Sequence, residues 1–155
     1  MKRYDIDGGI PTLAVALSEH MRADELKKLA SLTSGKVPTR KAELVDLIAR
    51  QHLAGDGLRT AWQSLDELQK AAVAEVVHSP GTQFRADRFR AKYGRAPSWG
   101  SLNIYRHDER PTGLRFFFYG REGGGGVMPD DLKERLEAFV PPPASATVTS
   151  LVELP

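Results

Sequence analysis

Short helical runs of apolar residues, each closed by glycine or proline, constrain the fold of this 155-residue chain more than any other sequence feature. Thr12 is a candidate N-cap, and Leu13, Leu17 and Met21 follow it at helical spacing. Further helices are expected at 23–32, from Thr39 to about 54, at 65–77, at 85–93 and from about Met128 to Val140. The pattern predicts a mainly α fold built from many short helices.

The boundaries of these helices can be predicted from capping chemistry. Thr39 is expected to cap the third helix, and Ser64 with Glu67 forms a capping-box pattern before the fourth. The stretch Gly55-Asp56-Gly57 indicates a linker. We therefore expect a helical domain at 1–58, a second domain at 59–143, and a linker or truncated tail at 144–155, so that the chain would be the N-terminal part of a larger protein.

One segment has the character of a β-strand. Residues 116–119 are consecutive aromatics, and the glycine-rich run Gly120–Gly126 that follows them is expected to form a mobile loop. A small antiparallel sheet is expected here, which makes the fold class mainly α (α+β). The aromatic side chains, with Trp62 and Trp99, are expected in the core rather than stacked on nucleic-acid bases.

The net charge of +2 hides a strong segregation of charge along the chain. Residues 20–52 carry seven Lys and Arg against four acids, a net charge of +3. Residues 84–121 carry nine Lys and Arg against three acids, a net charge of +6, and eight of the nine basic residues are arginine. Arginine forms two hydrogen bonds to one phosphate, so this segment suits nucleic acid.

Residues 24–50, DELKKLASLTSGKVPTRKAELVDLIAR, resemble the SAP motif, a helix, an extended loop and a second helix. The matching positions are Leu26, Leu29, Lys41, Ala42, Glu43, Leu44 and Ile48. The resemblance implies binding to DNA, either nonspecific or with a preference for A·T pairs.

Residues 65–143 resemble the winged-helix modules of bacterial helicases and helicase-associated repair proteins. The resemblance depends on Phe89–Gly94, the aromatic segment 116–119, and the stretch from Pro129 to Pro141. The resemblance implies two helices followed by a strand, a wing and a closing helix. It also implies a protein that works on duplex DNA.

Together these features predict a non-enzymatic DNA-binding region that targets a larger DNA-processing protein to duplex DNA with weak sequence specificity. Arg85, Arg88 and Lys92 fall within about 60° of one another on the 85–93 helix, which makes them candidate contacts of a recognition helix. The remaining candidates are Lys36, Arg40, Lys41, Arg95, Arg106, Arg110, Arg115 and Arg121. The alternative is a protein-interaction module that binds an acidic partner protein.

The sequence offers no signature of an enzyme, a metal site or a cofactor site. It has no cysteine, and its four histidines lie far apart. The Gly120–Gly126 run lacks the lysine and hydroxyl residue of a phosphate-binding loop, and Asp130 and Asp131 suit a helix start. No run is apolar enough to cross a membrane, and no signal peptide is recognisable, so a cytoplasmic location is expected.

Overall fold

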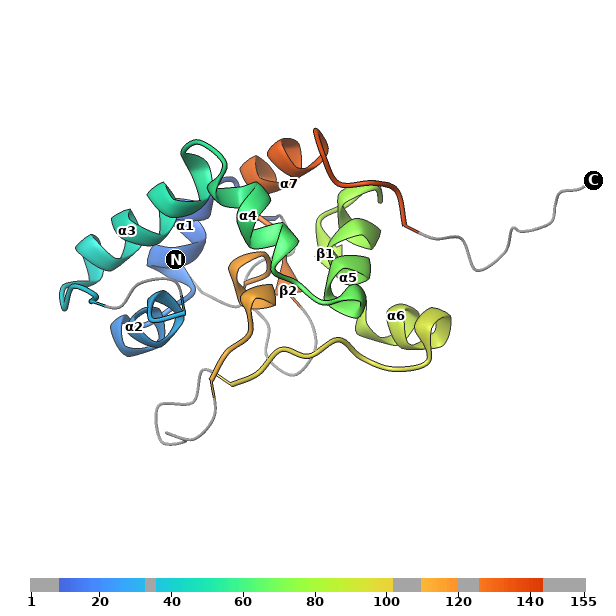
Figure 1. Ribbon diagram of the computed structural model, residues 1–155, viewed down its shortest axis with the longest axis horizontal. Coiled ribbons are helices and arrows are strands. Elements are labelled where there is room, and N and C mark those ends of the chain that lie inside the picture. Colours follow the sequence, from blue (N-terminus) through green and yellow to red (C-terminus); the bar gives the residue numbers. More distant parts are fainter. Residues whose placement is uncertain (1–8, 33–35, 102–109, 120–125, 144–155) are drawn as a thin grey trace, which may run out of the picture.

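The computed structural model describes residues 9–32, 36–101, 110–119 and 126–143. This part of the chain is mainly helical with a small antiparallel sheet, which confirms the predicted fold class (Figure 1). The elements in order are α1 (Leu13–Glu19), α2 (Ala23–Ala30), α3 (Lys41–Leu53), α4 (Gly57–Gln63), α5 (Glu67–Val77), β1 (Gln83–Phe84), α6 (Ala86–Tyr93), the 3-10 turn η1 (Gly113–Phe116), β2 (Gly126–Val127) and α7 (Asp130–Leu136).

Helices α1, α2 and α4 pack around α3, and each of them contacts it. Leu44 and Ile48, one turn apart on α3, are completely buried, so the predicted apolar face is the packing face. Thr12 caps α1 as expected, because its hydroxyl accepts the amide of Val15 at 3.1 Å.

Two predicted caps were wrong by one or two residues. The N-cap of α3 is Arg40, without a side-chain hydrogen bond, rather than Thr39. At α5 the capping box is formed by Asp66 and Gln69, whose side chains each accept the other's backbone amide at 2.8 and 2.9 Å. Ser64 ends α4 instead, and its hydroxyl donates to the carbonyl of Ala61 at 2.8 Å.

The expected linker at Gly55–Gly57 is a tight turn between two helices, because α4 begins at Gly57. The expected domain boundary at 58 therefore falls within a helix. Residues on both sides of it belong to one hydrophobic cluster, and the Asp131 carboxylate of α7 accepts the Leu13 amide of α1 at 3.0 Å. Separate folding of 1–58 and 59–143 stays a prediction, and the tail from 144 lies outside the described residues.

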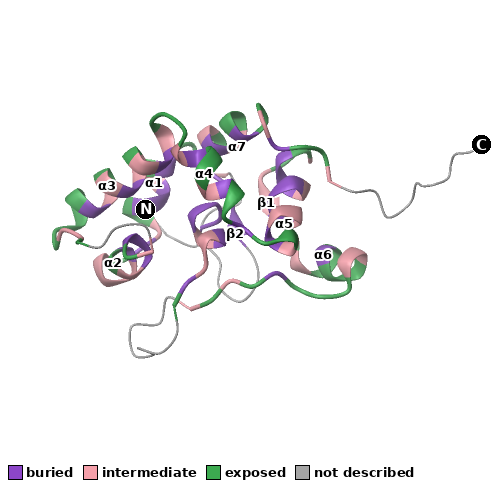
Figure 2. Ribbon diagram, in the orientation of Figure 1, coloured by how far each residue is buried: buried purple, intermediate pink, exposed green. Residues whose placement is uncertain are grey.

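The aromatic segment 116–119 does not form the strand that its composition predicted. Gly113–Phe116 is a 3-10 turn, and only Tyr119 pairs with Val127, as an isolated bridge. The sheet consists of β1 and β2, with Gln83 opposite Val127. All four aromatic side chains are buried, as Figure 2 shows for this part of the ribbon, and this confirms their expected place in the core.

No helix among the described residues has the length and apolar character needed to cross a membrane.

Candidate nucleic-acid interface

Helix α6 is held to the core by aromatic side chains on one face. Phe89 is 4% exposed, and its ring lies 4.4 Å from that of Tyr93 and 5.4 Å from that of Phe84, between ring centres. Gly94 ends the helix in the left-handed conformation with φ +85°. The predicted helix at 85–93 and its aromatic anchor are confirmed.

The arginines at the start of α6 are free to bind an anion. Arg85 is the N-cap residue, and Arg88 lies one turn further on. Both are exposed, and neither forms an ion pair with any residue that the structure describes. Arg95, just beyond the helix, is also exposed and has no described partner. These three guanidinium groups leave their donors to solvent or to a ligand.

Lys92, the third residue of the predicted recognition face, is in a different environment. Its ammonium lies 2.5 Å from the Glu75 carboxylate of α5, and its side chain is 27% exposed. The Tyr93 hydroxyl donates to the same carboxylate oxygen at 2.7 Å. Desolvation and the Glu75 carboxylate raise the pKa of Tyr93, so its phenol stays a donor. Lys92 is thus already neutralised by an internal acid.

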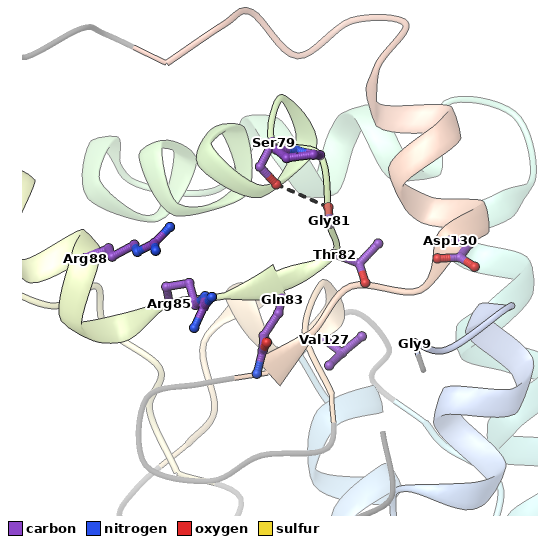
Figure 3. A pocket seen from close by; sticks show the side chains of 10 residues that line it. Gly9, Ser79, Gly81, Thr82, Gln83, Arg85, Arg88, Val127 and Asp130 are labelled. Carbon is purple, nitrogen blue, oxygen red and sulfur yellow. Dashed lines mark hydrogen bonds between the residues drawn. The ribbon is translucent and has the colours of Figure 1, made fainter. Parts of the chain in front are cut away.

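A partly open cleft of about 380 Å³ lies beside Arg85 and Arg88 (Figure 3). Its other lining residues are Gly9, Ser79, Pro80, Gly81, Thr82, Gln83, Val127 and Asp130. In Figure 3 the two arginines lie on one side of the cleft and Asp130 lies on the opposite side. Sequence reasoning treated Ser79–Gly81 only as a helix breaker and Asp130 only as a helix start, and no local signal brings these segments together.

The turn that forms one wall of the cleft is fixed by several hydrogen bonds. The Lys133 ammonium donates to the carbonyls of Ser79 at 2.6 Å and Gly81 at 2.5 Å. The Ser79 hydroxyl donates to the Val76 carbonyl at 2.8 Å, and the Met128 amide donates to the Thr82 carbonyl at 2.8 Å. This wall is therefore preorganised by α7 and the sheet.

The arginines proposed as flanking or wing contacts do not form one set. Arg115 donates to the carbonyls of Trp99 and Gly100, both at 3.0 Å, which is a structural role. Arg110 is exposed and donates to the Ser31 hydroxyl of the turn after α2 at 2.9 Å. Arg106 and Arg121 lie outside the described residues.

The SAP-like basic residues form a second exposed group. Lys36, Arg40 and Lys41 precede or begin α3, and none has an ion-pair partner within the described ranges. Figure 1 places the start of α3 and helix α6 toward opposite ends of the long axis. The structure thus does not bring the two predicted DNA-binding groups together.

No cluster of three His, Asp or Glu side chains suited to a metal occurs in the described ranges. His52 is buried, its Nδ1 donates to the Ile48 carbonyl at 2.8 Å, and its ring lies 4.3 Å from that of Phe116, between ring centres. Burial lowers its pKa, so the ring is a neutral part of the core.

The chain matches no protein-family model, and no curated protein or solved structure matches it.

Proposed function

We propose that this chain is a non-enzymatic module that binds duplex DNA with weak sequence preference. The single observation that carries the proposal is the pair of exposed arginines, Arg85 and Arg88, at the start of a helix whose Phe89 is buried in the core. No acid among the described residues is paired with either arginine. Arg95 extends this group beyond Gly94.

The physical basis is the release of counterions from the DNA phosphates. Each phosphate that a basic side chain neutralises makes the slope of log affinity against log salt concentration more negative by about 0.9. Guanidinium groups also make two hydrogen bonds to one phosphate. Because Phe89 fixes the helix to the core, little conformational entropy of the backbone is lost when Arg85 and Arg88 bind.

The resemblances described above suit the same role. A SAP-like unit and a winged-helix unit in one chain would place two DNA contacts on a protein of the helicase-associated type, and the module would position a DNA-processing activity on the duplex. Lys36, Arg40 and Lys41 are the contacts proposed for the SAP-like unit.

Salt-dependent binding to a 24-base-pair duplex, followed by fluorescence anisotropy, tests the proposal. We expect Arg85→Ala combined with Arg88→Ala to weaken binding and to reduce the magnitude of the salt slope by up to about 1.8, which corresponds to two phosphate contacts. A control with the same loss of charge, Lys27→Ala combined with Arg59→Ala on α2 and α4, should keep the slope of the parent protein.

The alternative, an acidic partner protein, predicts a different result. Exposed arginines pair with carboxylates as well as with phosphates. If the parent protein and the double alanine variant bind the duplex with equal affinity and equal salt slope, α6 is not a DNA contact and the protein-interaction function becomes the better account.

A further inference from the structure

The geometry points to the cleft beside α6 as a binding site for one terminal phosphate monoester of a nucleic-acid strand. This inference rests on the proposed function, because it names which part of the DNA the arginines of α6 engage. The cleft is lined by Arg85 and Arg88 on one side and by Asp130 on the other (Figure 3).

Charge favours a monoester over the phosphodiester of a continuous strand. A phosphate monoester carries close to two negative charges at neutral pH, as in a phosphorylated side chain, whereas each backbone phosphodiester carries one. Arg85 and Arg88 supply two positive charges with no described acid bound to either. On the arginine side of the cleft the two guanidinium groups attract this dianion more strongly than a monoanionic diester, whereas Asp130 on the opposite wall repels a phosphate that moves toward it.

The opposite wall determines how many phosphates fit. The carboxylate of Asp130 lines the cleft across from the arginines and would repel a second phosphate. A strand that runs through the cleft would bring its next phosphate toward this acid. A strand end avoids the repulsion, since its sugar and base, with their hydrogen-bond donors, can face Asp130, Thr82 and Gln83.

Shape supports the same assignment. At about 380 Å³ the cleft falls in the range of small-ligand sites, of the order of 300–1,000 Å³. Double-stranded DNA is too broad to enter such a recess and can only touch its rim. A terminal nucleotide can enter, and the wall it meets is already fixed by Lys133, which holds the carbonyls of Ser79 and Gly81.

Fluorescence anisotropy with the full chain and hairpin duplexes that differ only in their ends tests the inference. Each hairpin has a short unpaired extension at its open end, so that a terminal nucleotide can enter the cleft, and the ends carry a 5′-phosphate, a 3′-phosphate or only hydroxyl groups. We expect one phosphorylated hairpin to bind at least about tenfold more tightly than the unphosphorylated one, in line with a strong charge-assisted contact. Arg85→Ala combined with Arg88→Ala should abolish this preference.

A variant with the same loss of charge separates the cleft from general basicity. Arg90→Ala combined with Arg95→Ala removes two exposed arginines of the same region that do not line the cleft, so overall affinity falls while the preference for a terminal phosphate remains.

The outcomes distinguish this inference from the proposed function. Equal affinity for all three hairpins, with binding still dependent on Arg85 and Arg88, overturns the strand-end site and leaves the DNA-binding proposal standing. If the parent protein binds none of the hairpins, the proposed function is overturned. If deoxyguanosine monophosphate then shifts the NMR signals of Thr82 and Gln83, the cleft is a monoester site for a free nucleotide, and the strand-end source is overturned.

Discussion

The ammonium of Lys92 on α6 lies 2.5 Å from the carboxylate of Glu75 on α5, so a lysine of the predicted recognition face is bound within the protein. The two residues are 17 positions apart in sequence. The Tyr93 hydroxyl shares the same carboxylate, which makes the group a local network that fixes the end of α6 to α5.

Lys92→Ala should therefore affect stability rather than DNA binding. We expect the variant to lose about 1 kcal/mol of unfolding free energy, since the ion pair is only partly buried, and to keep the affinity and salt slope of the parent. Arg88→Ala is the matched change on the same helix and should show the opposite pattern. Chemical denaturation measures the unfolding free energy of each variant, and fluorescence anisotropy measures its DNA affinity and salt slope. If Lys92→Ala reduces the salt slope as much as Arg88→Ala does, Lys92 is a DNA contact and the structural role assigned to it is wrong.

The contrast between Lys92 and Arg88 shows where sequence reasoning ends. The period of a helix places Arg85, Arg88 and Lys92 on one face, and the fold confirms the helix. The period cannot show which residue of another helix lies against that face. The acid that neutralises Lys92 comes from α5, and the wall of the cleft comes from the turn after α5 and from α7.

Errors at caps and at the aromatic segment have a similar origin. The capping chemistry near Ser64 was recognised, but the hydroxyl of Ser64 is used at the end of α4, so Asp66 begins the next helix. High β propensity favoured a strand at 116–119, but the chain forms a 3-10 turn that ends at Phe116, and all four consecutive aromatics are buried. Tertiary packing decided both cases.

Phe89→Ala should destabilise the protein by about 3 kcal/mol or more, because the ring is buried between those of Phe84 and Tyr93 and the neighbours cannot close the cavity fully. Thermal melting followed by circular dichroism measures the effect. A decrease below about 1 kcal/mol would show that α6 is not anchored by this ring.

The SAP-like unit has its own test. Changing Lys36, Arg40 and Lys41 together to glutamate should lower DNA affinity and leave the thermal melt nearly unchanged, because all three side chains are exposed and have no described ion-pair partner. Competition binding at fixed salt measures the loss. An unchanged affinity with an unchanged melt would assign this group a structural or solvating role only.

His52 should make the stability of the fold depend on pH. Burial lowers the pKa of the folded-state ring below the ordinary histidine value of about 6.5, so the unfolded chain binds the proton more readily. The contribution of His52 is complete above about pH 6.5 and is lost as the pH falls from there through the folded-state pKa. Urea denaturation at pH 8, 7, 6 and 5 measures this loss. His52→Gln should reduce it, whereas parallel profiles for parent and variant would show that His52 does not contribute.

Substitution of Gly57 tests whether Gly55–Gly57 is a flexible linker or the tight turn that the structure shows. A Cβ atom at this position would lie 1.6 Å from the carbonyl oxygen of Gln51 in α3, so Gly57→Ala must displace α4 from α3. We expect a loss of at least about 2 kcal/mol in urea denaturation. Gly81→Ala is the control, because Gly81 has open space around it and no positive φ, and should change stability by less than about 1 kcal/mol. A linker at Gly55–Gly57 predicts instead that both alanine variants unfold at the same urea concentration as the parent protein.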